Sequence, residues 1–274
     1  MLCRVLRVTR AGYYAWRSHQ ASVHDARDDE LLASIRRIYA DSRETYGAPR
    51  VLMMLRREGV HTSKRRVARL MRDNGMRGIC RTRKYRTGRK VRPERDSSMD
   101  LVRREFHAEE PNRLWFADIT YVNTRQGWLF LAVVFDVFSR MVVGWAMSSR
   151  INAELADDAL RMAIARRNPP AGLIHHSDHG SQYCSLMLGS TMKARGIRPS
   201  MGSIASPWDN AITESLMSTI KMECVHRYKF ETRDQARLEI FDYIETFYNR
   251  VRIHSSLGGL SPIEYEKQQL QTVN

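Results

Sequence analysis

The segment from residue 114 to residue 149 most constrains the fold of this chain, because it reads as three consecutive β-strands. Its runs LWFADITYV, WLFLAVVFDVFSR and MVVGWAMSS are rich in β-branched and aromatic residues, and short polar breaks separate them. The runs are apolar on both faces, which is typical of a sheet covered by helices. We therefore expect three antiparallel strands at the centre of a layered domain.

Helical and strand patterns alternate after this segment. A helix is predicted over 152–167 with Asn152 as its N-cap, and the short strand LIHHS ends just before Asp178. The pattern then predicts a helix over 182–195, a strand around 198–201, a helix from about 207 to 226 and a helix over 233–249. This order of elements predicts a ribonuclease-H-like α/β fold, with a mixed five-stranded sheet flanked by helices.

The chain before residue 77 is helical and basic. Three helices are predicted, over 28–40, 48–57 and 64–73, and Thr62 or Ser63 caps the last one. The last two suit a small helix-turn-helix domain, in which the later helix faces DNA. That helix carries Lys64, Arg65, Arg66, Arg69 and Arg72. An ordinary basic surface helix is the alternative.

Positive charge is concentrated in the first part of the chain. The formal net charge is +15, and residues 1–110 hold 27 Lys and Arg against 14 Asp and Glu, whereas residues 111–274 hold 18 against 16. This asymmetry favours a nucleic-acid-binding region joined to a catalytic body, and a solvated basic surface without a partner is the alternative. We predict a helical DNA-binding region over 1–76, a basic linker over 77–111 and a catalytic core over 112–274. In the linker, the cations expected to lie along DNA phosphates are Arg83, Lys84, Arg86, Arg89 and Lys90.

Several classes of protein do not fit this sequence. No run of about 18 apolar residues is present, so no segment is expected to span a membrane. The basic start of the chain lacks the apolar stretch of a secretory signal. The four cysteines are scattered, which argues against a zinc ribbon and a disulfide framework. We expect a cytoplasmic protein associated with the bacterial nucleoid.

Three acidic residues are the candidate catalytic and metal-binding groups. Asp118 lies within the first core strand, where an uncompensated charge is costly, and Asp178 directly follows a short apolar strand. Glu214 lies on a helix, and Lys221 follows it by two helical turns on the same face. Carboxylates that meet in the fold can hold two divalent cations, which cut and join phosphodiester bonds. A buried Arg or Lys partner for Asp118 is the structural alternative.

Other polar residues have competing interpretations. A zinc site built from His175, His176 and His179 is one, but consecutive strand residues point to opposite faces and do not easily bind one ion. Asp136 is predicted to be a turn or structural residue, and a supporting role at the site is the alternative. The acids predicted to be solvated helix positions are Asp157, Asp158 and Glu223.

Several motifs, in the right order, resemble those of one family. They are YGAPRVLMMLRREG, WFADITYV, WLFLAVVFDVFSRMVVGW, LIHHSDHGSQY, SMGSIASPWDNAITES and FYNRVRIHSSLGGLSPIEYE. They resemble the second-reading-frame (ORF B) product of insertion-sequence-three-type transposases, which carries a retroviral-integrase-like core. The resemblance covers residues 113–266 nearly continuously, and a helix-turn-helix precedes the core.

The resemblance implies a DDE transposase that cleaves DNA strands and transfers a 3′-hydroxyl. It implies that Asp118, Asp178 and Glu214 form the catalytic triad and bind two Mg²⁺ ions, with Mn²⁺ as a substitute. It places Lys221 and Asn210 against DNA. The implied partners are double-stranded DNA of the transposon ends and target, further copies in a multimer on DNA, and an upstream-frame (ORF A) product. A ribonuclease-H-like nuclease that does not join DNA and a non-catalytic DNA-binding regulator are the alternatives.

Overall fold

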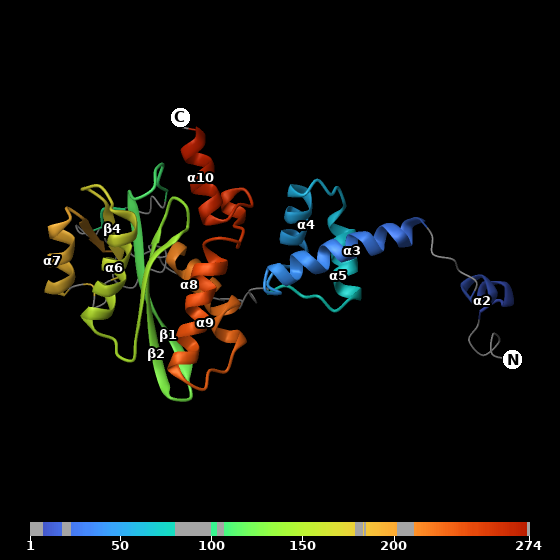
Figure 1. Ribbon diagram of the computed structural model, residues 1–274, viewed down its shortest axis with the longest axis horizontal. Coiled ribbons are helices and arrows are strands. Elements are labelled where there is room, and N and C mark those ends of the chain that lie inside the picture. Colours follow the sequence, from blue (N-terminus) through green and yellow to red (C-terminus); the bar gives the residue numbers. More distant parts are fainter. Residues whose placement is uncertain are drawn as a thin grey trace, which may run out of the picture. The chain divides into compact units, whose positions relative to one another are not determined.

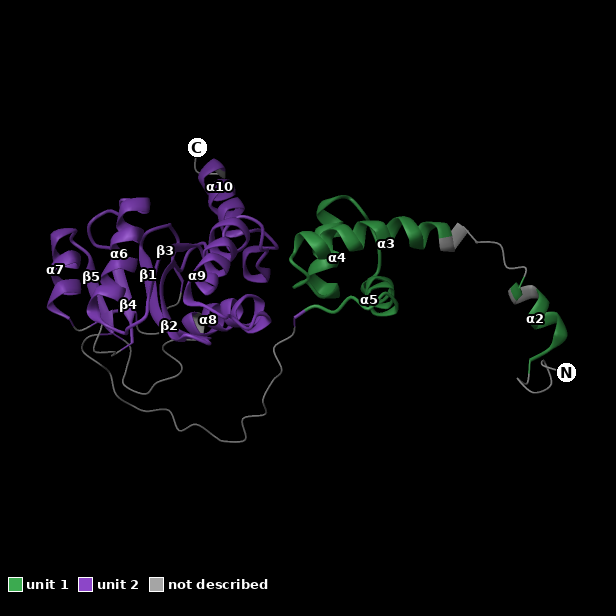
Figure 2. Ribbon diagram, turned by 60° about the horizontal axis from the view of Figure 1, so that its bottom comes forward, with its two compact units in different colours: residues 1–78 green, residues 79–274 purple. Residues whose placement is uncertain are grey.

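The chain forms two compact units, residues 1–78 and residues 79–274 (Figure 2). The computed structural model describes residues 8–17, 23–79, 100–102, 107–178, 183, 185–201 and 211–272. The described residues of the first unit are helical, and the second unit contains a sheet. Among the described residues, no helix combines the length and the apolar character that crossing a membrane requires.

The first unit consists of short helices around a small apolar core. Its described helices are α2 (Arg10–Arg17), α3 (Val23–Asp41), α4 (Ala48–Arg57) and α5 (Lys64–Asp73). Helices α3, α4 and α5 enclose the fully buried side chains of Ile35, Val51, Leu55 and Val67. Ser63 caps α5, since its Oγ accepts a hydrogen bond from the Arg66 amide at 3.2 Å. The predicted bounds of α4 and α5 are confirmed, whereas α2 was not predicted.

The second unit is built on a mixed five-stranded sheet, as predicted. Its strands are β1 (Leu114–Thr124), β2 (Gly127–Asp136), β3 (Val142–Ser148), β4 (Ile174–Ser177) and β5 (Arg198–Met201). Their order is β3-β2-β1-β4-β5. Strands β1, β2 and β3 pair antiparallel along the chain, whereas β4 is parallel to both β1 and β5. The long strand β1 is therefore central.

Helices cover both faces of this sheet (Figure 1). On one face lie α6 (Ala153–Arg167) and α7 (Leu186–Ala194), which enclose the core around Trp115 and Leu160. Gly144 of β3 lets α6 approach closely, because a Cβ there would lie 2.2 Å from the Ala159 carbonyl oxygen. On the other face lie α8 (Ala211–Glu223) and α9 (Arg233–Asp242). Asn152 caps α6 as predicted, since its Oδ1 accepts from the Leu155 amide.

The chain ends in short helical elements that complete the second unit. They are η1 (Val225–Arg227), η2 (Tyr243–Tyr248), η3 (Ser255–Leu257) and α10 (Pro262–Thr272). The first and third are 3₁₀-helices, and η2 is a π-helix that continues α9. Helix α10 was not predicted.

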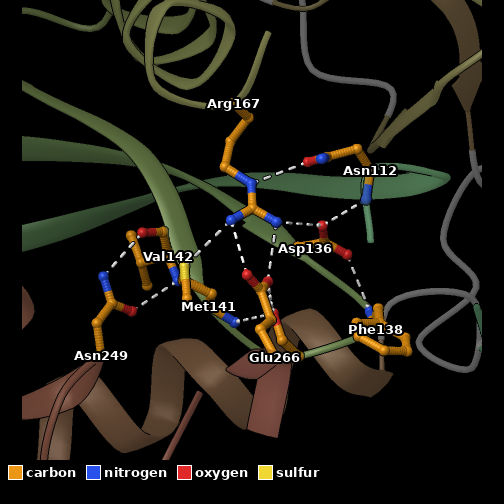
Figure 3. A network of polar contacts seen from close by, with 9 residues as sticks. Asn112, Asp136, Phe138, Met141, Val142, Arg167, Asn249 and Glu266 are labelled. Atoms are coloured by element: carbon orange, nitrogen blue, oxygen red, sulfur yellow. Dashed lines mark hydrogen bonds and ion pairs between the residues drawn. The ribbon is translucent and has the colours of Figure 1, made fainter. Parts of the chain in front are cut away.

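A buried ionic network ties α10 to the sheet (Figure 3). The Arg167 guanidinium, at the end of α6, donates to both carboxylate oxygens of Glu266 at 2.8 and 2.9 Å. It also lies 3.6 Å from Asp136, whose side chain is fully buried. Asp136 is the last residue of β2 and accepts from the amides of Asn112 and Phe138, so it has the structural role that was predicted as one of two possibilities.

Two other acids were predicted wrongly to be solvated. Asp157 is 2% exposed and accepts hydrogen bonds from Arg161 and Thr191, which couples α6 to α7. Glu223 is 5% exposed and receives two hydrogen bonds from Arg252 and one from Tyr243. Both acids follow a helical pattern that is compatible with solvent, but partners distant in the sequence bury them.

The Arg167 network predicts a large stability loss on removing its cation. Arg167→Met leaves Asp136 and Glu266 buried without their charge partner, and we expect the free energy of unfolding to fall by about 3–5 kcal/mol. Arg113→Met is the matched control, because its partner Glu110 is exposed and such surface pairs contribute about 0–1 kcal/mol. Urea denaturation of both variants measures the difference. Equal stabilities of the two variants would contradict the role of this network.

Candidate active site

Asp118 is the innermost of the three predicted acids. It lies in the middle of β1, opposite Val133 of β2, and is half-buried. Its Oδ1 accepts a hydrogen bond from the Ile119 amide at 2.8 Å. Burial raises the pKa of Asp118 to about 7, and the Ile119 amide opposes this rise. The negative charges of Asp178 and Glu214 raise this pKa further, whereas Lys221 lowers it.

The strand register explains why Asp178 lies beside Asp118. Strands β1 and β4 are parallel, and Phe116 pairs with His176. The observed pairing ends there, and continuing this register by two residues would bring Asp178 opposite Asp118. Asp178 is exposed and directly follows β4. The carboxyl end of a strand is where such sheets place ligands.

Helix α8 supplies the third acid and the lysine. Glu214 lies in its first turn and is exposed, whereas Lys221 is half-buried in its last turn. The opposite side of the helix is anchored in the core by Leu216 and Ile220. Since the charges of Glu214 and Lys221 both act on the pKa of Asp118, α8 brings these side chains to the edge of β1.

The three acids form an open cluster. Among the residues that the structure describes, no three His, Cys, Asp or Glu side chains are grouped closely enough to hold a metal ion. Asp178 precedes the segment 179–182, and Glu214 follows the segment 202–210, both of which lie outside the described residues. Asp178 and Glu214 are thus close enough to act electrostatically on Asp118.

A buried ion pair fixes the far end of α8. Glu223, the last residue of α8, accepts from Arg252 Nε and Nη2 at 2.6 and 2.7 Å. The Tyr243 hydroxyl donates to the same carboxylate at 2.9 Å. Arg252 also lies over the ring of Tyr248, at 5.8 Å from its centroid. The segment after α9 therefore sets the position of the helix that carries Glu214.

Tyr183 lies next to the acids and was not predicted from the sequence to belong to the site. Its side chain is 6% exposed, and its hydroxyl has no hydrogen-bond partner among the described residues. Burial raises its pKa well above the usual value, and the charges of Asp118 and Asp178 add to the rise. A phenol without a partner among the described residues, and near enough to feel both carboxylates, is a donor for a substrate or water oxygen. The only signal in the sequence was an aromatic residue five positions after Asp178.

The two histidines of β4 lie in different environments. His175 is buried near Tyr183, with ring centroids 6.3 Å apart, and burial lowers its pKa to about 4. His176 lies on the other face, where its Nδ1 is 2.9 Å from Ser200 Oγ. Their predicted opposite orientation is confirmed. His179 lies outside the described residues.

The predicted DNA-binding residues of α5 differ in their surroundings. Lys64 and Arg65 are exposed in the first turn of α5. Arg66 pairs with Asp28 of α3 at 2.5 Å, and Arg69 pairs with the other oxygen of the same carboxylate. Asp28 therefore neutralises part of the charge of this helix. The remaining predicted DNA contacts lie outside the described residues: Asn210, Arg83, Lys84, Arg86, Arg89 and Lys90.

Comparison with known proteins identifies the family. Models of the integrase core domain match residues 108–207 and 214–270, and a model of an HTH-like domain matches residues 26–84. The chain is 40% identical over 275 residues to the transposase InsF for insertion sequence IS3A of Escherichia coli (strain K12). That match covers 98% of this chain and 94% of its relative. The chain belongs to the IS3-type transposases.

Further comparisons agree with this membership. The insertion element IS600 31 kDa protein of Shigella sonnei is 39% identical, over 97% of this chain and 98% of that protein. A chain in the cryoEM structure of the simian T-cell lymphotropic virus intasome with PP2A regulatory subunit B56 gamma shares the fold. It has 17% identity and a TM-score of 0.50, and covers 75% of the transposase and 67% of that chain.

Membership settles the class of reaction. This transposase is an enzyme of the polynucleotidyl transferase type, with an integrase catalytic core and an HTH-like helical domain. The two domains imply that it binds DNA, and integrase cores depend on divalent metal ions. The predicted fold class is confirmed.

The raised pKa of Asp118 predicts how stability depends on pH. Between pH 4 and pH 7 the folded chain keeps a proton on Asp118 that the unfolded chain releases, so this group lowers the free energy of unfolding as pH rises. We expect Asp118→Asn to be more stable than the wild type at pH 8 without divalent metal, by on the order of 2 kcal/mol. The two proteins should converge at pH 4.

Urea denaturation across this pH range tests the expectation. Asp136, whose pKa burial raises to about 6, is present in both proteins, so its effect cancels in the difference. The two proteins could instead differ in their free energy of unfolding by an amount that does not change with pH. That result would show that ionising Asp118 does not destabilise the folded chain.

Proposed function

We propose that Asp118, Asp178 and Glu214 are the catalytic, metal-binding carboxylates of this transposase. The observation that carries the proposal is their convergence at the edge of β1, from three segments far apart in the sequence. The raised pKa of Asp118 supports it, because a carboxylate whose charge is destabilised by burial and neighbouring acids gains most from a cation.

The donor set fits a hard divalent cation. Carboxylate oxygens are the ligands that Mg²⁺ prefers, and Mn²⁺ accepts the same ligands. Asp118, Asp178 and Glu214 would hold two Mg²⁺ ions. When bound, such ions activate an attacking oxygen and stabilise the leaving oxygen of a phosphodiester.

The protein side chains align the DNA for two successive reactions. In the first, water attacks a phosphodiester at a transposon end and exposes a 3′-hydroxyl. In the second, that hydroxyl attacks another phosphodiester, so the DNA strand itself is the nucleophile. Lys221 would hold a phosphate of the end as a compact positive charge, two turns along α8 from Glu214. The unpaired hydroxyl of Tyr183 would donate to a non-bridging oxygen or to water.

The helical unit would bind DNA through α5. Lys64 and Arg65 are exposed cations in its first turn and Arg72 is exposed in its last turn, whereas Asp28 holds Arg66 and Arg69. We propose double-stranded transposon ends and target DNA as substrates, and a multimer that holds two ends together. The upstream-frame (ORF A) product would contribute end recognition, and the cytoplasmic nucleoid is where this DNA lies.

Asp118→Asn should abolish cleavage and joining while leaving DNA binding intact. We expect both rates to fall more than about 100-fold. Loss of a metal ligand should cost more than loss of a residue that only hydrogen-bonds to such a ligand. The assay combines labelled end DNA, a target plasmid and Mg²⁺, and separates cleaved from joined products by size. Asp158→Asn, on the exposed face of α6, is the matched control and should retain activity.

Three results of this assay would contradict the proposal. Joining by Asp118→Asn would show that the metal assignment is wrong. Cleavage without joining by the wild type would indicate a nuclease. DNA binding with neither reaction would indicate a regulator.

The exposed cations of α5 predict a change in the salt dependence of DNA binding. Lys64→Gln and Arg65→Gln should each reduce the slope of log K against log salt by about 1, because each phosphate contact releases counterions. Arg37→Gln is the control, since Glu58 already pairs with Arg37 on α3 at 2.5 Å. Fluorescence anisotropy with end DNA at several salt concentrations measures the slopes. Unchanged slopes for both α5 variants would exclude this helix from the DNA interface.

A further inference from the structure

A groove lies along the edge of β1, beside the acids. It has a volume of about 720 Å³, within the range of about 300–1,000 Å³ that ligand sites occupy. The end of β1 and the start of β2 form one wall, and the last turn of α8 with the chain through Phe230 forms the other. Figure 1 shows these elements running alongside each other. At the far end Phe230 bridges to Thr124 and closes the groove.

Exposed aromatic side chains line this groove. Tyr121 and Trp128 are 55% and 54% exposed, on neighbouring strands, and Tyr228 is 44% exposed on the opposite wall. Tyr121 contacts Phe130 and Trp128 edge to face, at centroid distances of 5.5 and 6.1 Å. These contacts fix the ring of Tyr121 without burying it. Three large aromatic residues that line one hollow and stay exposed to solvent mark a binding surface.

The same groove is positively charged. Arg125, Lys221 and Lys229 line it, and none of the described lining residues is acidic. Arg125 pairs with Glu231 at 3.2 Å, but both side chains are more than half exposed, so the pair is weak and leaves the cation available. Exposed aromatic rings interleaved with cations are the combination that binds an unpaired nucleic-acid strand. The rings stack on bases while the cations contact phosphates.

Lys221 connects the groove to the reaction centre. It lines the groove, and its charge also acts on Asp118. A strand whose phosphate Lys221 holds at the acids therefore continues into the groove. The transposon end is the DNA that stays bound through both proposed reactions, so a stacking surface beside the acids serves the end rather than the target.

We propose that this groove binds an unpaired stretch of the transposon-end DNA, with bases stacked on Tyr121, Trp128 and Tyr228 and phosphates held by Arg125, Lys221 and Lys229. This inference rests on the proposed function, because it extends the same active site. It predicts that the terminal base pairs of the end open when the transposase binds, and that ends opened in advance bind more tightly than fully paired ends.

Affinity measurements on the full chain test the stacking surface. Trp128→Ala and Tyr228→Ala should each weaken binding to an end duplex with unpaired terminal bases by about 5- to 100-fold. Both should lose the preference for opened over fully paired ends. Phe241→Ala is the matched control, an aromatic residue of α9 that is 48% exposed and lies outside the groove, and should stay within about twofold of wild type. Unchanged affinities for both groove variants would overturn the proposal.

Photo-crosslinking of the wild type tests the same surface without a substitution. End DNA carrying 5-iodouracil at its terminal positions should crosslink to Tyr121, Trp128 or Tyr228, identified by mass spectrometry. If crosslinks arise only when the target plasmid carries the label, the groove binds target DNA. That result would overturn the proposal that it binds the transposon end.

The same samples separate this inference from the proposed function. Cleaved and joined products without groove crosslinks would overturn the groove and leave the catalytic proposal standing. Groove crosslinks without any cleavage or joining by the wild type in Mg²⁺ would overturn the catalytic proposal and support the groove as a DNA site.

Discussion

The short pairing between β1 and β4 is the constraint on which the site depends. Strand β1 pairs with β2 over its whole length but with β4 only through Leu114–Phe116. Beyond this point the edge of β1 is available to side chains instead of to a strand. Asp118 lies at the start of this edge, Asp178 emerges from β4 at the same level, and α8 packs along it. A longer β4 would extend the ladder past Asp118 and displace both the acids and the groove.

The same edge explains the electrostatics of the second unit. Burial beside other acids makes the charge of Asp118 costly, so the folded chain holds an unfavourable charge where a cation would be most stabilising. Other parts of the second unit stabilise the fold, through buried ion pairs that hold its helices in place. Glu223 and Arg252 fix the end of α8, and Arg167 with Glu266 fixes α10 against the sheet. The charge of Asp118, in contrast, is opposed by burial and by the neighbouring acids.

Local patterns were sufficient to predict the five strands and the bounds of α4 and α5, and they singled out the three acids that we propose as the site. These features depend on apolar periodicity, capping residues and the position of an acid within a strand, all of which are visible in short windows. Glu223 was misjudged because its partner Arg252 lies 29 residues away and its own helix pattern is compatible with solvent. Tyr183 and the groove were missed for a related reason: an exposed or buried aromatic residue gains meaning only from neighbours that the fold supplies.

Anomalous diffraction from crystals of the transposase grown with Mn²⁺ is the most direct test of the central claim. Mn²⁺ accepts the oxygen ligands of Mg²⁺ and can be located by its own scattering. We expect an ion between Asp118 and Asp178, with carboxylate oxygens within about 2–2.5 Å, and Glu214 drawn toward it or toward a second ion. Strong Mn²⁺ binding at other residues, with these three carboxylates still apart, would contradict the account.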